Sequence, residues 1–454
     1  HEVISLLSDI PDLWDVKMDA SPTDCGSSRF RQEGSHEPTI DFMKQVTDKP
    51  VVGVGRFTSP DTMVSQVNRG ILDLIGGARA SIADPFLPEK IRSGKEDQIR
   101  ECIGCNLCIA SWHDGVPVRC TQNATAGEEW RKSWHPEQFK PAHADENVLV
   151  VGGGPAGLEA ALVAAKRGYR VTLADGMQQL GGRVILEARL PGLSAWRRVA
   201  DYRLHALKQM ERVSLYPDSQ LEPDDIAEFS DHHVVIATGA RWTKSLYSAS
   251  EVPVGEMEGP SVHTPDDLMA GIVPEAPVLI YDFDNYYMGG VLAENLASKG
   301  LKTFYLTPAG HASAWTIMTN EQPFVHAALH RAGVIVLTQS LLLEHDGECA
   351  RISNIFTGNE ECLAVCSVVI VGLRLPNDSL FRRLTSSSDN PEQRNIRSIE
   401  RVGDCLAPGA IMHAVYSGHS WARNLGCVST EDNYLRDLPV SINPPGAAIR
   451  KFDD

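Results

Sequence analysis

The chain has 454 residues, 43% of them hydrophobic and 22% charged, which is enough apolar material for about three globular domains. Its formal net charge of −17 argues against nucleic acid and against an anionic membrane as main partners. The sequence contains no run of about 18 apolar residues, which a membrane-spanning helix would require. No signal peptide is visible either, so we expect a cytoplasmic protein.

The first hundred residues alternate short helical and short extended stretches. Helices are predicted over 1–8, 39–46 and 60–69, and strands over 13–18, 50–55 and 73–76. This alternation is typical of parallel βα units. Three units cannot close a barrel, so we expect residues 1–100 to be the C-terminal part of a TIM barrel, with the earlier strands outside this sequence.

Two arginines follow the last two predicted strands of this segment. Gly55 and Arg56 come after one strand, and Ala78 and Arg79 come after the next. In βα-barrels the loops after the last two strands commonly bind phosphate, and guanidinium groups supply fixed donor forks. The alternative is that both arginines are solvated loop residues, but their occurrence on consecutive units favours a phosphate site.

Four cysteines mark the segment 101–144. Cys102, Cys105 and Cys108 are separated by two residues each, and Cys120 follows after eleven more. This spacing suits the four thiolate ligands of a 4Fe–4S cluster, with Gly104 relieving crowding in the loop. A structural zinc site more often shows two separated Cys-x-x-Cys pairs, and a disulfide would strain so short a loop.

The other six cysteines are scattered and are expected to be reduced thiols, because a long chain with few cysteines is not a secreted disulfide framework. They are Cys25, Cys349, Cys362, Cys366, Cys405 and Cys427.

A dinucleotide-binding domain is predicted over 145–275 and 380–430. A buried-strand run, Val148–Val151, leads into a glycine motif formed by Gly152, Gly154 and Gly157, and a helix is predicted over 158–167. In this pattern the first glycine makes the turn, the second admits a pyrophosphate and the third lets the helix meet the sheet. Asp175 ends the next strand, where an acid takes ribose hydroxyls.

Further residues predicted to bind the same nucleotide follow along the chain. They are Gly182, Arg183, Gly239, Gly403 and Asp404. The run Val402-Gly403-Asp404 and a helix over 413–424 resemble the closing motif of glutathione-reductase-like flavoproteins, in which the helix N-terminus faces phosphates. The alternative is a surface turn and a helix cap. The motif does not distinguish FAD from ADP.

Between these two halves, residues 276–379 predict a second, inserted Rossmann-like unit. A strand over 277–281 and a helix over 290–299 are present, but Asp282, Asp284 and Tyr287 stand where glycines are expected. Carboxylates would repel a pyrophosphate and side chains would block its approach. We therefore expect a degenerate NAD(P)-type domain without its ligand, followed by a C-terminal arm over 431–454.

Several strings resemble one family of iron–sulfur flavoproteins. The strings Ser28-Arg29-Phe30, 81–88 (SIADPFLP) and 120–129 (CTQNATAGEE) are similar to trimethylamine dehydrogenase-like proteins of the old yellow enzyme and 2,4-dienoyl-CoA reductase superfamily. The resemblance extends from about Leu13 to Gly426. It implies FMN at the barrel mouth, with Arg79 at the FMN phosphate and the 4Fe–4S cluster beside it.

The same resemblance suggests two catalytic residues. Asp24 matches the aspartate of the family's Tyr-His-Asp group, although a turn residue before Gly26 is the alternative. Trp112 matches a wall of an aromatic bowl that holds a methylated ammonium by cation–π attraction. The alternative for Trp112 is a core tryptophan packed over the cluster.

The implied function is an amine dehydrogenase. A secondary or tertiary N-methyl amine would be oxidised at FMN, and electrons would pass through the cluster to an electron-transferring flavoprotein, in a homodimer. Two alternatives remain open at this point: an NAD(P)H-dependent 2,4-dienoyl-CoA or enone reductase, and a non-catalytic module that holds only cluster and nucleotide. The acidic residues Asp282 and Asp284 favour the dehydrogenase over the reductase.

Overall fold

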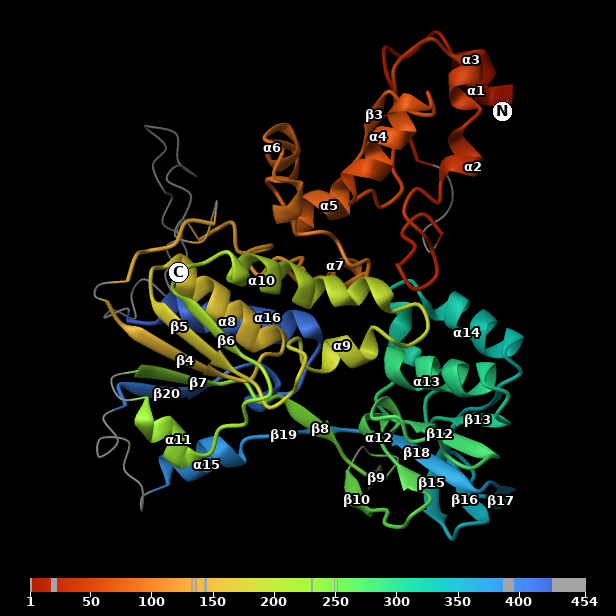
Figure 1. Ribbon diagram of the computed structural model, residues 1–454. Coiled ribbons are helices and arrows are strands. Elements are labelled where there is room, and N and C mark those ends of the chain that lie inside the picture. The colour runs from red at the N-terminus through yellow and green to blue at the C-terminus, as the bar shows by residue number, and fades with distance from the viewer. Residues whose placement is uncertain are drawn as a thin grey trace, which may run out of the picture.

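The computed structural model describes residues 2–17, 23–131, 134, 137–142, 145–229, 232–248, 250, 252–386 and 396–426. An N-terminal part projects from a body that contains two five-stranded parallel sheets, several smaller sheets and the surrounding helices (Figure 1). The predicted C-terminal arm, 431–454, lies outside the described residues, as does the end of the strand predicted over 13–18.

The N-terminal part contains a three-stranded parallel sheet in the order β1-β2-β3. Its elements are α1 (Glu2–Leu7), β1 (Trp14–Val16), α2 (Glu37–Ile40), α3 (Met43–Val46), β2 (Val51–Gly53), α4 (Pro60–Asn68) and β3 (Leu74–Ile75). The predicted alternation of strands and helices is confirmed, but the helix predicted over 39–46 is divided into α2 and α3. A small core around Ile40, Met43 and Phe57 joins the sheet to its helices. The assignment to a TIM barrel stays a prediction.

Short helices and a long loop carry the chain from this sheet to the body. They are α5 (Ala78–Ala83), α6 (Leu87–Arg92), η1 (Glu96–Gln98) and α7 (Leu107–His113). Cys108 lies within α7, and the other three cysteines of the predicted cluster lie in the loops before and after it; Figure 1 shows α7 next to α10.

The first sheet of the body is parallel and has the order β20-β7-β4-β5-β6. Its strands are β4 (Asn147–Val151), β5 (Arg170–Ala174), β6 (Val213–Tyr216), β7 (His232–Ile236) and β20 (Ser398–Arg401). Its helices are α8 (Pro155–Lys166), α9 (Arg183–Glu187), η2 (Ser194–Arg197), α10 (Arg198–Lys208), α11 (Pro223–Glu228), α15 (Ser379–Thr385), η5 (Gly403–Cys405) and α16 (Ile411–Asn424).

Both faces of this sheet are covered, which explains the unbroken apolar run of β4. Val148 and Val150 pack toward α8, α10 and α16, whereas Leu149 and Val151 pack toward α11 and α15. Figure 1 shows these two helical layers above and below the strands. The sequence predicted this β4–α8–β5 unit, although α8 begins at Pro155, three residues before the predicted start.

The second sheet of the body is also parallel and has the order β11-β18-β12-β13-β14. Its elements are β11 (Val262–His263), α12 (Pro265–Met269), β12 (Val278–Asp282), α13 (Tyr287–Ser298), β13 (Thr303–Leu306), η3 (Ala314–Ile317), α14 (Gln322–Arg331), β14 (Ile335–Leu337) and β18 (Ser367–Val371). A three-stranded antiparallel sheet packs against it: β15 (Ser340–His345), β16 (Cys349–Asn354) and β17 (Glu360–Ala364). Two small sheets connect the units: β8 (Ala240–Trp242) with β19 (Arg374–Pro376), and β9 (Ser245–Tyr247) with β10 (Pro253–Glu256).

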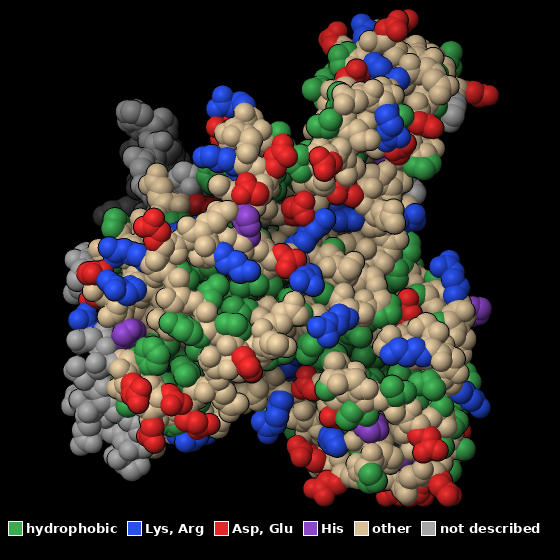
Figure 2. Space-filling view, in the orientation of Figure 1, with side chains coloured by type: hydrophobic (Ala, Val, Ile, Leu, Met, Phe, Trp, Pro, Cys, Tyr) green, Lys and Arg blue, Asp and Glu red, His purple; other side chains and the backbone are tan. Residues whose placement is uncertain are grey.

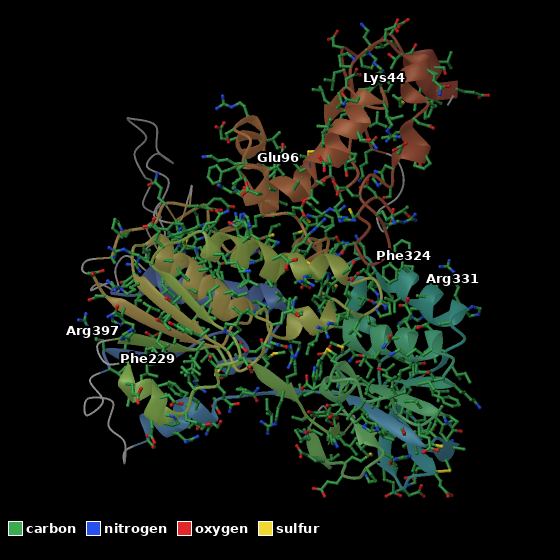
Figure 3. The ribbon with its side chains drawn as sticks, in the orientation of Figure 1. Lys44, Glu96, Phe229, Phe324, Arg331 and Arg397 are labelled. Carbon is green, nitrogen blue, oxygen red and sulfur yellow. A yellow bond between two sulfur atoms is a disulfide. The ribbon has the colours of Figure 1, made fainter. Side chains whose placement is uncertain are left out.

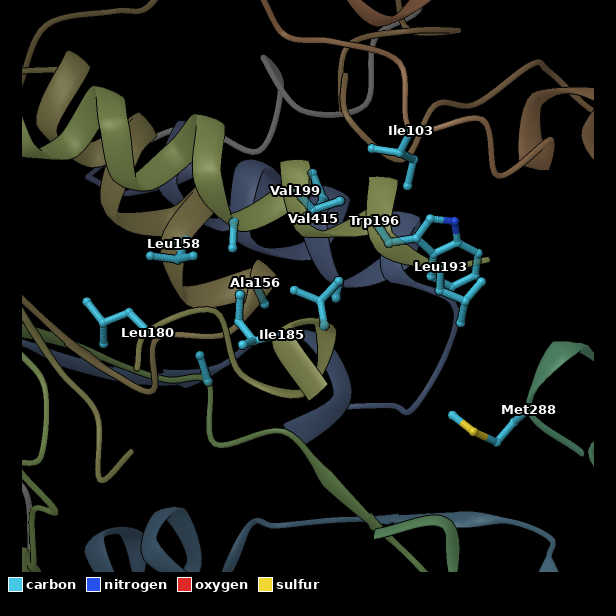
Figure 4. Close-up of a cluster of buried hydrophobic side chains, with 14 of the residues drawn as sticks. Ile103, Ala156, Leu158, Leu180, Ile185, Leu193, Trp196, Val199, Met288 and Val415 are labelled. Atoms are coloured by element: carbon cyan, nitrogen blue, oxygen red, sulfur yellow. The ribbon is translucent and has the colours of Figure 1, made fainter. Parts of the chain in front are cut away.

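One continuous apolar core joins the cluster segment to both sheets of the body. It includes Ile103 next to the cysteine loop, Ala156 and Leu158 on α8, and Met288 on α13. Figure 4 shows Ile103 above Trp196, with Leu158 and Val199 within the layer of helices. The cysteine loop is therefore held by hydrophobic burial as well as by its own turns.

One prediction about the scattered cysteines is wrong. Cys349 and Cys362 form a disulfide, with their Cα atoms 5.7 Å apart. The antiparallel pairing of β16 with β17 brings these residues together, and the spacing along the sequence gave no sign of that pairing. Cys25, Cys366 and Cys405 are free thiols, as predicted, and Cys427 lies outside the described residues.

The described surface carries no single dominant charge on the face seen in Figure 2, where acidic and basic side chains are interspersed. Within the described residues, none of the helices combines the length and the apolar character that crossing a lipid bilayer requires.

Candidate functional site

Close packing and two hydrogen bonds from Ser28 fix the backbone of the loop that carries the first three cysteines. Gly104 has φ +63, and a Cβ there would lie 2.8 Å from the Ser28 nitrogen. The Ser28 amide donates to the Gly104 carbonyl at 2.9 Å, and its hydroxyl donates to the Ile103 carbonyl at 2.6 Å. Only glycine fits this conformation and this approach. The N-terminal part of the chain thus holds the loop in place.

The cysteine sulfurs are surrounded by hydrogen-bond donors. The Gly104 amide donates to Cys102 Sγ at 3.3 Å, and Thr121 Oγ1 lies 3.1 Å from Cys105 Sγ. Burial raises the pKa of Cys105, and burial followed by the charges of Cys120 and Cys102 raises the pKa of Cys108 to about 12. Ionised thiolates in so buried a place need a positively charged metal centre to neutralise them.

This donor set fits a 4Fe–4S cluster, in which each thiolate takes its own iron. Across the part of the chain that the structure describes, no three His, Cys, Asp or Glu side chains converge closely enough to share one metal ion. The four cysteines nevertheless lie close enough to interact electrostatically: Cys108 and Cys102 act on Cys105, Cys120 and Cys102 act on Cys108, and Cys102 acts on Cys120.

The two predicted phosphate-binding arginines lie together next to this loop. Arg79 Nη1 donates to the Gly26 carbonyl at 3.0 Å and to Asn106 Oδ1 at 2.8 Å, and Arg56 Nη2 donates to the Arg31 carbonyl at 2.7 Å. Burial lowers the pKa of Arg56, the Cys102 thiolate opposes that change, and the charge of Arg79 adds to it. The alternative of solvated loop residues is wrong, because both side chains are partly buried and hydrogen-bonded.

The loop glycines beside these arginines allow close backbone contacts. A Cβ on Gly55 would lie 3.1 Å from the Gly34 Cα, and two residues separate the end of β3 from Ala78, which begins α5. Because β2 and β3 are neighbouring parallel strands, the two loops that follow them lie at the same end of the three-stranded sheet.

The two catalytic candidates lie in different environments. Asp24 is in a turn with its side chain 11% exposed, 3.4 Å from Lys17 Nζ and 4.0 Å from His36 Nδ1. Trp112 on α7 is 69% exposed, so the alternative of a core tryptophan packed over the cluster is wrong. Its exposed indole lies one helical turn beyond Cys108.

The glycine motif forms the tight turn that a bound pyrophosphate requires. A Cβ on Gly157 would lie 1.9 Å from the Gly152 oxygen, and a Cβ on Gly152 would lie 2.4 Å from the Ala237 oxygen. Gly182 approaches Gly154 closely, since a Cβ on Gly182 would lie 2.9 Å from the Gly154 Cα. These contacts leave a backbone-lined cradle at the N-terminus of α8.

Asp175 stands at the edge of that cradle, at the end of β5. Its carboxylate accepts hydrogen bonds from the amides of Gly153 at 2.5 Å and Met177 at 2.6 Å. It therefore holds the glycine turn and also lines the cavity where a ribose would bind.

A cavity of about 970 Å³ extends from this cradle toward the cysteine loop. Gly152, Gly154, Asp175, Gly182, Arg183, Gly239 and Asp404 all line it, so the structure brings these predicted residues together. Gly403 lies beneath them, where a Cβ would be 2.5 Å from the Ala156 Cβ. Cys105 and Thr121 line the far end of the same cavity.

Several lining residues come from the inserted unit, and all of those named here except Tyr287 were not identified from the sequence. Arg374 donates to Asp404 Oδ2 at 2.8 Å and to the Gly409 carbonyl at 2.8 Å. Tyr287 donates to Glu187 Oε2 at 2.9 Å, and burial raises the pKa of Glu187. Tyr286 stacks edge-on against both Tyr287 and Trp315. No motif marks Arg374, Tyr286 or Trp315, because each reaches the cavity through tertiary packing.

The glycine-free turn of the inserted unit is filled by its own side chains. Asp282 accepts hydrogen bonds from the Tyr305 hydroxyl and, at 3.0 Å, from the Asn285 amide. A Cβ on Gly289, in the first turn of α13, would lie 2.5 Å from the Asp282 Cγ. Burial, and next the charge of Asp284, raises the pKa of Asp282 to about 7.

The cluster segment is also joined to the inserted unit. Asn106 Nδ2 donates to the Thr319 carbonyl at 2.9 Å, and Phe30 stacks on Phe324 with ring centroids 5.6 Å apart. Figure 3 shows Phe324 at the end of α14 that is nearest the N-terminal segment. Arg29 adds a nearly buried ion pair with Glu294 at 3.0 Å.

Two family models match this chain. The model described as NADH:flavin oxidoreductase / NADH oxidase family matches residues 5–98. The model described as pyridine nucleotide-disulphide oxidoreductase matches residues 146–270. The first match covers the three-stranded sheet and the second covers the glycine cradle.

Three relatives extend the likeness over nearly the whole chain. Dimethylamine dehydrogenase of Hyphomicrobium sp. (strain x) is 37% identical over 93% of this chain and 61% of its own length. The structure of 6-hydroxypseudooxynicotine amine oxidase from Pseudomonas geniculata N1 has a TM-score of 0.90 at 48% identity, over 94% of this chain and 64% of that one. Histamine dehydrogenase from Rhizobium sp. 4-9 has a TM-score of 0.92 at 42% identity, over 98% of this chain and 65% of that one. The chain therefore spans less than two thirds of each relative.

Proposed function

Because this chain belongs to the dimethylamine dehydrogenase-like family of flavoprotein oxidoreductases, we propose that it is part of an iron–sulfur amine dehydrogenase. The proposed substrate is a secondary or tertiary N-methyl amine, which is oxidised to an iminium ion and then hydrolysed to the smaller amine and an aldehyde. The observation that carries this proposal is the position of the four cysteines, between the paired arginines of the N-terminal part and the nucleotide cradle.

Each cofactor of the proposal has its own residues. Arg56 and Arg79, with the loops of Gly55 and Ala78, would hold the FMN phosphate. Cys102, Cys105, Cys108 and Cys120 would hold a 4Fe–4S cluster, which supplies one-electron steps between a flavin and an external acceptor. The cradle at α8 would hold FAD or ADP.

The residues of this chain would also shape the amine site. Asp24, buried beside Lys17 and His36, would orient the reacting amine through its charge. Trp112 would offer its exposed face to a methylated ammonium. The proposed electron acceptor is an electron-transferring flavoprotein.

Asp282 favours the dehydrogenase over a nicotinamide-dependent reductase. Its carboxyl occupies the position of the first glycine, against the first turn of α13, where a pyrophosphate would have to lie. A nicotinamide nucleotide would meet both this side chain and Asp284, which lines the cavity.

The test uses the holoprotein under anaerobic conditions, mixed separately with NADPH and with a panel of N-methyl amines. We expect the flavin absorbance to bleach with at least one amine and to persist with NADPH. Rapid bleaching by NADPH would contradict the proposal and support the reductase. Nucleotide released from denatured protein and separated by chromatography would distinguish FAD from ADP.

A further inference from the structure

A chain of buried charged side chains lies between the cluster segment and the nucleotide-binding domain. Its central residue is Arg203 on α10, which has no solvent exposure. Glu159 on α8, His419 on α16 and Gln122, two residues after Cys120, are each at most 5% exposed. A buried arginine and a buried glutamate are costly unless both are fully hydrogen-bonded, so their presence calls for an explanation.

The planar guanidinium group of Arg203 donates hydrogen bonds to Gln122 and to Glu159 at the same time. Its Nη1 and Nη2 donate to the Gln122 side-chain and main-chain oxygens at 2.9 and 3.0 Å. Its Nε donates to Glu159 Oε2 at 2.7 Å. Lysine offers no such geometry, because its donors radiate from one point. The guanidinium thus fixes the position of Gln122 relative to α8.

The other carboxylate oxygen of Glu159, Oε1, is also held by a hydrogen bond. Arg423 Nε donates to His419 Nε2 at 2.8 Å, and His419 Nδ1 lies 2.7 Å from Glu159 Oε1. Because arginine only donates, Nε2 of this histidine must accept, so Nδ1 carries the proton and donates to Glu159. The histidine is therefore neutral, and Glu159 keeps its negative charge for Arg203.

Gln122 connects Arg203 to the cysteine loop through two further hydrogen bonds. Its Nε2 donates to the Glu101 carbonyl at 3.0 Å and to the Arg198 carbonyl at 3.3 Å. Glu101 precedes Cys102, and Arg198 Nη1 donates to the Cys102 carbonyl at 3.2 Å. One glutamine side chain therefore links the Cys120 corner, the Cys102 corner and α10.

We propose that Arg203 is a positioning residue for the cluster, holding the Cys120 corner to the nucleotide-binding helix α8 through Gln122 on one side and Glu159 on the other. This inference rests on the proposed cluster. The buried charges would keep the four thiolates at the spacing that the cluster needs, because they anchor the cysteine loop to the buried helix α8.

The test compares Arg203→Met, Gln122→Ala, the double variant and the control Arg197→Gln. The control removes an arginine charge just before α10, where the Arg197 side chain is 54% exposed and pairs with Asp201. The readouts are the rate of iron release from the holoprotein to a chelator, the electron paramagnetic resonance spectrum of the reduced cluster, and the circular dichroism of the fold.

We expect Arg203→Met and Gln122→Ala each to release iron about tenfold faster than the wild type while the circular dichroism is unchanged. The double variant should release iron no faster than Arg203→Met alone, because both side chains act in one path. Arg197→Gln should match the wild type.

Wild-type release rates in both single variants, or effects that multiply in the double variant, would overturn the inference. If Arg203→Met does not fold, Gln122→Ala decides alone, since it leaves the Arg203–Glu159 pair in place. A wild-type protein that holds no iron and sulfide would contradict the proposed function and this inference together. A cluster that the variants retain normally would contradict the inference only.

Discussion

Asp282 is a carboxylic acid with a fully buried side chain, which its position in the sequence alone does not imply. It ends β12 fully buried, with the Tyr305 hydroxyl on one oxygen and the Asn285 amide on the other. The sequence predicted that an acid here would repel a pyrophosphate. The structure adds that the same carboxyl packs against Gly289 and fills the turn.

The raised pKa of Asp282 leads to a prediction about how the stability of the protein depends on pH. Its pKa rises from 3.8 to about 7 on folding, mainly through burial. The folded state then binds more protons than the unfolded state between these values, so stability should fall as pH rises through this window, by up to about 4 kcal/mol. Asp282→Asn should remove that fall. Denaturant midpoints at about pH 5 and about pH 8 measure it, and an equal pH dependence in both proteins would contradict the assignment.

Cys105 gives a second prediction at this scale. Its sulfur is buried, lies against Thr121 and lines the inner end of the cavity. Cys105→Ser should lose the cluster's contribution to the visible absorbance and most of the iron, because one corner of the cluster has no thiolate. Cys366→Ser is the matched control, as a free cysteine far from the loop. Full iron content in Cys105→Ser would exclude Cys105 as a ligand.

At the scale of elements, α8 is where sequence and structure agree best. A strand run, a glycine motif and a helical pattern are all local signals. Gly152 and Gly157 meet the close contacts that their places in the motif require, whereas Gly154 leaves the space beside it open. The β16–β17 disulfide was missed because it depends on the register of a hairpin. Arg374, Tyr286 and Arg203 were missed because their partners lie far away in the sequence.

The close contact at Gly157 predicts the effect of a single methyl group. Gly157→Ala would place a Cβ 1.9 Å from the Gly152 oxygen, so α8 must move away from the turn. We expect a loss of about 1–3 kcal/mol in stability and at least tenfold weaker nucleotide binding. Gly310→Ala is the control, since a Cβ there meets nothing within 4 Å. Calorimetry and nucleotide content measure both effects, and normal nucleotide retention in Gly157→Ala would contradict the cradle.

At the scale of the whole molecule, the cysteine loop is the point where the parts of the chain meet. Ser28 holds it from the N-terminal part, Arg203 of the nucleotide domain holds it through Gln122, and Thr319 of the inserted unit accepts a hydrogen bond from Asn106. The inserted unit keeps its parallel sheet but fills its own nucleotide turn, and its side chains instead support the loop and the cavity. The sequence predicted the order of the parts, whereas these contacts between them required the structure.

This arrangement predicts that nicotinamide nucleotides do not bind at the inserted unit. Titration of the holoprotein with NADPH should give no saturable quenching of tryptophan fluorescence from Trp315, which lies beside Tyr286. The double variant Asp282→Gly with Asp284→Gly tests whether the two carboxylates prevent NADPH from binding. We expect this variant to bind NADPH more tightly than the wild type. Tight NADPH binding to the wild type would refute it.

The most direct test of the account is whether an amine delivers electrons to the cluster. Holoprotein would be mixed anaerobically with an N-methyl amine, and separately with NADPH, and frozen for electron paramagnetic resonance. The account predicts the signal of a reduced 4Fe–4S cluster with the amine and none with NADPH. A signal with NADPH and none with any amine would contradict it.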